Sequence, residues 1–386
     1  MTDPIWLSAA QAVRMMARKE ISPLEYLDAI LARAEKVQGT LNPFTTIVAD
    51  RARAEARAAG DAIARGETLG ALHGLPVHVK DLFPTSGILT EYGSATRKGN
   101  VPTSDDVLVA RLRAAGAVIF AKSTTPEFGH KGQTDGPHFG TTRNPWDPSL
   151  AAGGSSGGAA VAVAAGAGPL GLGTDGAGSV RIPAAACGVV GLKPSPGLLP
   201  YGEAVDGFFS YAAAGPLCRT IEDAALMLRA ICGPHAADPW SIAAPVPVAH
   251  RVGATLHGLR VGYIACATNT LVAKDVETNT RAVLDLFAAR GAMVEEVTEE
   301  IDWIEYEGRV MYQANIAVAN GALIDNHRDL MDPVLVGFAE RGAGFSTEDY
   351  RRAQLARTRL FRCVFRGHPA SDSESIRPPI PILSGH

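Results

Sequence analysis

Three polar side chains in this sequence stand where a lysine base and serine nucleophiles could act. Lys80 follows the apolar run Leu75–Val79, Ser155 lies in the run GGSSGG, and Ser179 follows the run GTDGAG. A lysine at the end of a buried strand is partly desolvated, and desolvation disfavours its ammonium form. Such a lysine can take a proton near neutral pH and so activate a serine hydroxyl. For the dipeptide Lys80-Asp81 alone, a surface ion pair is the simpler alternative.

The glycine-rich run around Ser155 favours a shaped loop, with a flexible linker as the alternative. Runs of glycine and serine are commonly linkers. This run is short, however, and Ala159–Gly166, which follows it directly, is apolar and compatible with a core helix. Glycine also permits unusual backbone angles and the close approach of other groups. We therefore expect the run to be part of the folded domain.

The segment before Ser179 combines a buried strand with a glycine-rich turn. Leu170–Leu172 is typical of a buried strand, and Gly173–Gly178 follows it. Successive glycines before a serine can direct several backbone N–H groups to one point, where they stabilise an anion or a developing oxyanion. The alternative is a tight turn closed by a buried pair of Asp175 and Arg181.

Other glycine motifs are absent or weak. No glycine precedes a Lys-Ser or Lys-Thr pair, so the sequence has no P-loop. Gly171–Gly176 matches the dinucleotide-binding pattern in its letters, but the acidic residue expected about 20 residues later is missing. Gly153–Gly157 matches the nucleophile elbow of α/β-hydrolases, which requires a strand directly before it. The turn-forming segment Asn144–Pro148 precedes it instead.

The strands and helices expected around Lys80, Ser155 and Ser179 predict a layered α/β fold. Ser22 and Glu25 form a capping box around Pro23, which predicts a helix start. Strands and helices then alternate along the chain, which is typical of α/β proteins. The pattern predicts strands at 75–79, 117–120, 170–172, 259–264 and 292–294, and helices at 50–65, 104–115, 220–232, 274–290 and 346–366. We expect one large domain over 1–366 and a proline-rich, poorly ordered tail over 367–386.

Composition and charge narrow the class of protein. The 386 residues are 46% apolar and 20% charged, which argues against intrinsic disorder. The net charge of −4, without a basic run, argues against a nucleic-acid partner. The N-terminus has no secretory layout, and no apolar run is long enough to cross a bilayer. The five widely spaced cysteines indicate neither a zinc site nor a disulfide framework, so we expect reduced thiols, no metal and a cytoplasmic location.

Taken together, the three patches and their flanks resemble the amidase signature family. The resemblance extends from about residue 8 to about residue 362. It is carried by the sequences GLPVHVKD at 74–81, PEFG at 126–129, FGTTRNPWDP at 139–148, CGVVGLKP at 187–194 and GPLCRTIED at 215–223, besides the runs at Ser155 and Ser179. It implies an α/β fold with a large central mixed sheet that has helices on both faces.

The resemblance also implies roles for individual residues. Lys80 corresponds to the base, Ser155 to a relay serine that follows a cis peptide bond, and Ser179 to the nucleophile that forms an acyl-enzyme. Backbone N–H groups at Gly176, Ala177, Gly178 and Ser179 correspond to an oxyanion hole. Gly129 corresponds to a residue that lines the acyl pocket. A desolvated lysine can replace histidine as the base, so neither a metal nor another cofactor is expected.

The chain departs from the family pattern at two places. Many relatives have two glycines before the nucleophile, whereas this chain has Ala177-Gly178; alanine keeps its N–H but resists positive φ. After Arg366 the sequence stops resembling the family, which suggests that the C-terminal part of the fold is missing.

These observations predict an amidase, a hydrolase that converts a carboxylic amide to an acid plus ammonia or an amine. The expected partner is a small amide, with no nucleic acid and no membrane, and a homodimer is left open. One alternative is an inactive or unstable truncated homologue. Another is the glutamine-hydrolysing subunit of a tRNA-dependent amidotransferase, although relatives of that subunit commonly carry glutamine where this chain has Ile182. A fourth hypothesis, an α/β-hydrolase that uses Ser155, lacks the required strand.

Overall fold

A computed structural model describes residues 3–201, 212–243, 255–265, 271–297 and 303–366. The chain forms two compact units: Met1–Ala249 with Asn315–Ala343, and His250–Ala314 with Gly344–His386. The single domain expected over 1–366 stays a prediction. The tail expected to be poorly ordered, 367–386, lies outside the described residues.

The first unit is built on a six-stranded mixed sheet in the order β1-β3-β2-β4-β6-β5. Strand β2 pairs in parallel with β3 and β4, while the β1–β3, β4–β6 and β5–β6 pairs are antiparallel. The strands are β1 (Phe44–Ile47), β2 (Pro76–Lys80), β3 (Val118–Ser123), β4 (Leu170–Asp175), β5 (Val190–Gly191) and β6 (Ala213–Cys218). A mixed sheet flanked by helices is the α/β architecture that the sequence predicts.

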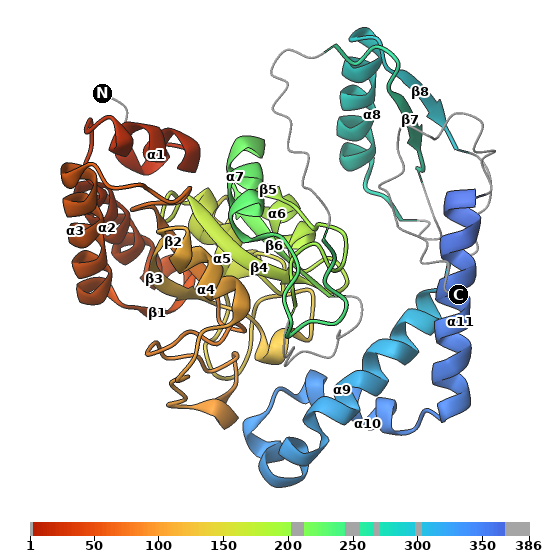
Figure 1. The fold of residues 1–386 in the computed structure, drawn as a ribbon. Helices are drawn as coiled ribbons and strands as arrows, with labels where there is room; N and C mark the ends of the chain where they lie inside the picture. Colours follow the sequence, from red (N-terminus) through yellow and green to blue (C-terminus); the bar gives the residue numbers. More distant parts are fainter. Residues whose placement is uncertain (1–2, 202–211, 244–254, 266–270, 298–302, 367–386) are drawn as a thin grey trace, which may run out of the picture. The chain divides into compact units, whose positions relative to one another are not determined.

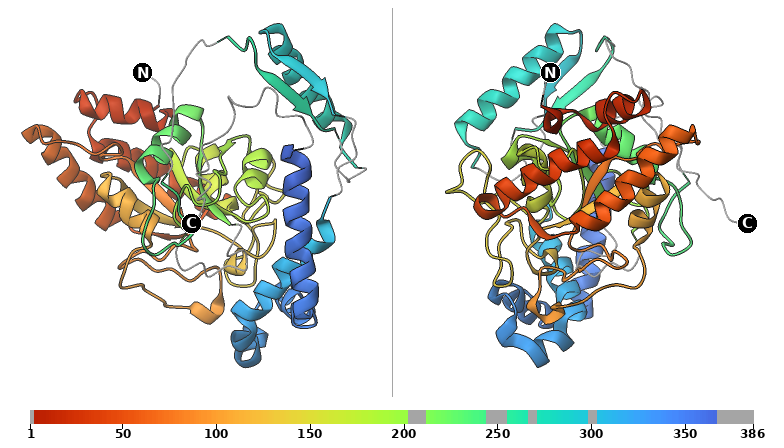
Figure 2. Two further views of the ribbon diagram at one scale, coloured as in Figure 1. Left: turned by 45° about the vertical axis from the view of Figure 1, so that its right-hand side comes forward. Right: turned by 90° about the vertical axis from the view of Figure 1, so that its left-hand side faces the viewer.

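The helices of the first unit enclose a core of alanine, valine, leucine and isoleucine side chains. Helices α2 and α3 run side by side (Figures 1 and 2), and α5 packs across β2, β3, β4 and β6. The helices are α1 (Ala9–Ala17), α2 (Pro23–Leu41), α3 (Ala49–Arg65), α4 (Val107–Ala114), α5 (Gly157–Ala164), α6 (Arg181–Cys187), α7 (Ile221–Ile231) and α10 (Pro333–Ala343), with short 3₁₀ turns η1 (Pro4–Trp6), η2 (Ala95–Arg97), η3 (Glu127–Gly129) and η4 (Arg328–Leu330).

The second unit places helix α8 (Lys274–Ala289) beside the parallel pair β7 (Arg260–Tyr263) and β8 (Met293–Glu296), as Figure 1 shows. It also contains α11 (Thr347–Arg366), and helix α9 (Glu305–His327) contributes residues to both units. No helix in the described ranges combines the length and apolar character needed to span a membrane.

Local sequence signals locate most elements to within a few residues. The capping box predicted at Ser22 is present: the Ser22 hydroxyl accepts from Glu25 N, and the Glu25 carboxylate accepts from Ser22 N. The helix predicted from residue 104 begins at Val107 instead. Asp106 is its N-cap, because the Asp106 carboxylate accepts from Leu108 N at 2.8 Å.

Candidate active site

Lys80 is the last residue of β2 and is completely buried. Hydrogen bonds join Lys80 Nζ to Ser155 Oγ at 2.6 Å and to Thr174 Oγ1 at 2.8 Å. The carboxylate of Asp81 instead accepts from the backbone N–H groups of Glu91 and Gly93. Lys80 and Asp81 therefore do not form a surface ion pair. Strand β2, between β3 and β4 in the sheet, instead places the lysine against the loop that carries Ser155.

The loop around Ser155 is tightly packed. The Gly154-Ser155 peptide bond is cis, as the family resemblance implies, and Ser155 is only 1% exposed. A Cβ atom at Gly157 would lie 2.3 Å from Thr134 Oγ1, and one at Gly158 would lie 2.3 Å from Thr124 N. Glycine is required at these places because neighbouring chain segments leave no room for a side chain. The linker alternative is wrong.

No strand leads into Ser155. Residues 139–153 are all described, and they contain only an isolated bridge between Arg143 and Ala151. Helix α5 follows the serine, so the strand–turn–helix of a nucleophile elbow is not formed.

The two serine-bearing segments are hydrogen-bonded to each other. Ser156 N donates to Ser179 O at 3.0 Å, and Ser156 Oγ donates to Thr174 O at 3.2 Å. Because Thr174 also contacts Lys80, the end of β4 links the lysine, the Ser155 loop and the Ser179 turn. Three segments that are distant in sequence thus meet at the ends of β2 and β4.

Asp175 shapes the turn that carries Ser179. Its fully buried carboxylate accepts from Gly178 N at 2.7 Å and from Arg181 Nε and Nη2, both at 2.9 Å. The tight turn with an Asp175–Arg181 pair therefore exists. Gly178 has φ of +116°, a conformation that side chains resist. The Gly178 N–H donates to Asp175 and is therefore not available to a ligand. In the described part of the chain, the N–H groups of Gly176, Ala177 and Ser179 donate to no protein acceptor and remain available to a ligand.

The Asp175 contacts predict a pH-dependent contribution to stability. Burial alone would raise the pKa of Asp175, but the Arg181 guanidinium and the Gly178 and Val180 N–H groups hold this pKa below its ordinary value of 3.8. The contribution is thus fully present above about pH 4 and is lost as the pH falls through the lower, folded-state pKa.

We expect Asp175→Asn to lower the free energy of unfolding by about 1–3 kcal/mol at pH 7, because buried donors lose their partner. Urea unfolding at pH 7 and pH 3 checks this: the wild type should lose more stability between the two pH values than the variant. Asp61→Asn, at an exposed carboxylate on helix α3, is the control. Equal losses in wild type and Asp175→Asn would contradict the prediction.

Gly129 lies directly beside the lysine–serine pair. A Cβ atom there would lie 2.9 Å from Leu82 Cδ1, 3.4 Å from Ser155 Oγ and 3.9 Å from Lys80 Nζ. Gly129 has φ of +70°, and Phe128 before it has φ of +48°. The predicted pocket residue therefore covers the pair with backbone alone.

Lys122, on β3, is a second fully buried lysine that the sequence analysis did not single out. Its ammonium donates to Phe83 O, to Thr85 Oγ1 at 3.0 Å and to Thr90 Oγ1 at 2.9 Å. Burial lowers the pKa of Lys122, and the charge of nearby Asp81 opposes this shift. The signal available in the sequence was a lysine directly after the apolar run Val118–Ala121.

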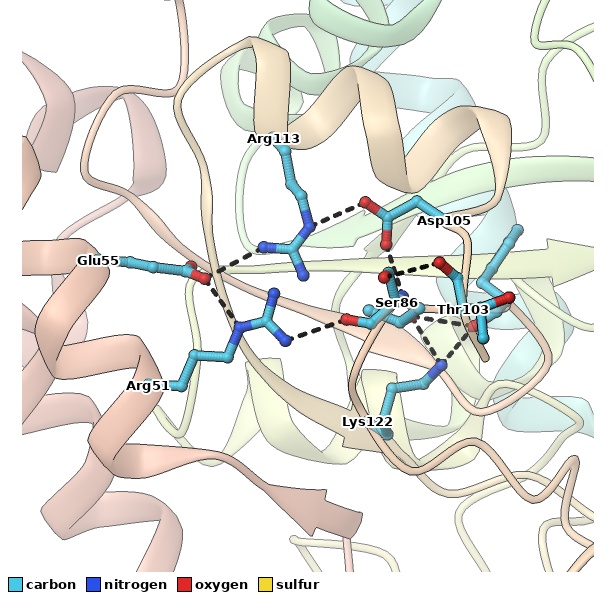
Figure 3. Close-up of polar contacts among 9 residues, drawn as sticks. Arg51, Glu55, Ser86, Thr103, Asp105, Arg113 and Lys122 are labelled. Atoms are coloured by element: carbon cyan, nitrogen blue, oxygen red, sulfur yellow. Dashed lines mark hydrogen bonds and ion pairs between the residues drawn. The ribbon is translucent and has the colours of Figure 1, made fainter. Parts of the chain in front are cut away.

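The surroundings of Lys122 hold the long connection between β2 and α4 against the sheet. Figure 3 shows Arg113 between Glu55 and Asp105, and Arg51 directed at the Ser86 carbonyl. This network anchors the segment that begins immediately after Lys80.

Comparison with known proteins identifies the family. The profile of the Amidase family matches residues 25–358. The chain belongs to the amidase family. It is 40% identical to an acylamidase from Rhodococcus erythropolis, over 76% of this chain and 62% of the relative. It is 39% identical to a glutamyl-tRNA(Gln) amidotransferase subunit from Roseiflexus castenholzii, over 92% of this chain and 74% of the relative.

The fold of this amidase-family chain is likewise similar to solved structures. A bacterial aryl acylamidase of the amidase signature family superposes with a TM-score of 0.86 at 28% identity, over 93% of this chain and 77% of that one. The chain thus spans about three fifths to three quarters of the length of these relatives. Both comparisons confirm the resemblance seen in the sequence.

Proposed function

We propose that this amidase-family chain hydrolyses a carboxylic amide through an acyl-enzyme on Ser179, with Ser155 as the proton relay and Lys80 as the base. The observation that carries the proposal is the buried 2.6 Å contact between Lys80 Nζ and Ser155 Oγ. The backbone bond from Ser156 N to Ser179 O supports it, because this bond ties the relay loop to the nucleophile turn.

In the acylation step, Ser179 Oγ attacks the amide carbon while its proton passes to Ser155 and the Ser155 proton passes to Lys80. The C–N bond then breaks, and the leaving amine takes a proton back through the same relay. Water attacks the resulting ester in the second half of the cycle and releases the acid and Ser179. The carbonyl oxygen becomes negative in both halves, and in this proposal the N–H groups of Gly176, Ala177 and Ser179 stabilise it.

Thr174 helps to hold the Lys80 amine in position for this proton relay. Complete burial favours the neutral amine, which has a lone pair for the Ser155 proton and two hydrogens for other partners. Thr174 Oγ1, 2.8 Å from Nζ, is one such partner. The lysine at the end of β2 is thereby held at the relay serine by a hydroxyl group on the neighbouring strand, β4.

We infer an apolar acyl group for the substrate. Ile182, which directly precedes Pro183, lies over the nucleophile turn: a Cβ at Gly178 would be 2.7 Å from Ile182 Cδ1, and one at Gly153 would be 3.2 Å from Ile182 Cγ2. An apolar side chain here offers no hydrogen bond to the polar end of glutamine. This observation favours an acylamidase over a glutamine-hydrolysing subunit, although both kinds of relative are similar to the chain.

Purified protein supplied with aryl and alkyl carboxamides, anilides and L-glutamine tests the proposal. We expect ammonia or amine release from the apolar amides at a higher kcat/KM than from glutamine. A fluorophosphonate probe followed by peptide mass spectrometry should place the adduct on Ser179. Preferential glutamine hydrolysis would support the amidotransferase-type alternative. The absence of both turnover and a probe adduct would indicate an inactive homologue.

Two further expectations stay predictions: a cytoplasmic location, and independence from nucleic acids, membranes, metals and other cofactors. A homodimer stays open.

A further inference from the structure

The turn that covers the catalytic pair is held in an unfavourable backbone conformation. Phe128 has φ of +48°, which is uncommon for a bulky residue and is maintained only where the surroundings impose it. Phe128 N donates to Tyr92 O at 2.8 Å, and the two aromatic rings stack. Gly129, the next residue, lies against Ser155 and Lys80. The position of this turn therefore bears directly on the reacting groups.

Glu127, at the start of the turn, is completely buried and uses both carboxylate oxygens. Oε1 accepts from Ser94 Oγ at 2.5 Å, and Oε2 accepts from the backbone N–H of Asp332 at 2.6 Å. Burial raises the pKa of this carboxyl, whereas the two donors stabilise its ionised form. The second contact joins the turn to a residue 205 positions away in the sequence.

Asp332 grips the other end of the turn. Its side chain is almost fully buried; Oδ2 accepts from Lys131 Nζ at 2.7 Å, and Oδ1 accepts from Val334 N at 2.9 Å in the first turn of α10. The ring of Phe338, one helical turn further along α10, packs edge-on against His130 at 6.1 Å. The start of α10 thus binds residues on both sides of Phe128-Gly129.

We propose that Glu127 and Asp332 are positioning residues that clamp the Phe128-Gly129 turn between α10 and the Lys80–Ser155 pair. This inference rests on the proposed function, because it assigns the clamp to the acylation step. Two buried carboxylates receive their hydrogen bonds from opposite elements, so neither the turn nor the start of α10 can shift without leaving a buried donor or acceptor unpaired. The clamp thereby keeps the Gly129 backbone against Ser155 Oγ and Lys80 Nζ.

Glu127→Gln and Asp332→Asn test the clamp, since each replaces an acceptor oxygen by an NH₂ group that must face a donor. We expect kcat to fall roughly 10- to 100-fold, because misplacements of about 1 Å near reacting groups have effects of this size. KM should change less than about threefold. The rate of fluorophosphonate labelling at Ser179, per mole of folded protein, should fall by the same factor as kcat.

Glu340→Gln is the matched control. Glu340 lies on the same helix, α10, and forms an exposed ion pair with Arg328 at 2.7 Å that does not touch the turn. Its kcat and labelling rate should equal those of the wild type. If Asp332→Asn does not fold, Lys131→Gln removes one partner of the Asp332 carboxylate, and a kcat loss of about 3- to 10-fold is expected.

The outcomes separate the two proposals. Folded Glu127→Gln and Asp332→Asn proteins with wild-type kcat and labelling rate would overturn the clamp and leave the proposed function intact. A loss of the same size in Glu340→Gln would also overturn the clamp, because it would indicate general destabilisation of α10. The absence of a Ser179 adduct and of amide turnover in the wild type would overturn both.

Discussion

Ser179→Ala should eliminate covalent labelling of the protein by a fluorophosphonate and lower amide turnover by about 10³-fold or more. The variant retains the turn, because Asp175 holds that turn through backbone N–H groups and Arg181 and makes no bond to the Ser179 hydroxyl. The loss is therefore chemical, and the melting temperature should change little. Stopped assays of ammonia release, with intact-protein mass spectrometry, measure both effects.

Two serine variants serve as comparisons. Ser155→Ala should also lower turnover strongly, because the proton from Ser179 loses its path to Lys80, while the Ser179 hydroxyl remains available for slow labelling. Ser195→Ala, at an exposed serine, should behave as the wild type. A probe adduct on Ser155 with none on Ser179 would reverse the assignment of the two serines.

Lys80→Met should lower turnover by a similar factor, about 10³-fold, and remove its dependence on alkaline pH. If the neutral amine is the base, wild-type turnover rises as the pH increases and the lysine loses its proton, and then reaches a plateau. Methionine fills the buried site but cannot take a proton, so the remaining rate should vary little with pH. Rate profiles of kcat from mildly acidic to alkaline pH provide the measurement.

Lys122→Met provides a matched comparison, because Lys122 is also fully buried and lies on the neighbouring strand. Its loss leaves Thr85 and Thr90 without their donor, so we expect lower stability. The folded fraction should keep the wild-type shape of the pH profile. A wild-type rate that peaks in mild acid would rule out a lysine base.

The residues of the candidate site could be found in the sequence because each follows a strong local signal. Lys80 ends an apolar strand, and glycine-rich runs flank Ser155 and Ser179. Local signals of this kind depend on neighbouring residues, as does the capping box at Ser22, which the structure reproduces. Local patterns left alternatives open, however. Lys80 could be a surface lysine or a buried one, and the run around Ser155 could be a linker or a packed loop.

Contacts between distant segments could not be predicted in the same way. Glu127 and Asp332 are 205 positions apart, and nothing in the composition of either segment indicates that they meet. Lys122 was overlooked because its three acceptors lie on a connection without periodicity, from Phe83 to Thr90. Similarly, Gly178 was expected to donate to a substrate, whereas its N–H donates to Asp175.

Residue types, short-range spacing and family resemblance were thus sufficient to predict the family, the α/β class and the candidate residues Lys80, Ser155 and Ser179. The folded chain was needed to establish that Lys80 is buried 2.6 Å from Ser155 Oγ and that the Ser155 loop is bonded to the Ser179 turn. These contacts arise because strand order and parallel pairing bring the ends of β2 and β4 together. Burial and hydrogen bonding between those ends follow from the whole sheet and from no single segment.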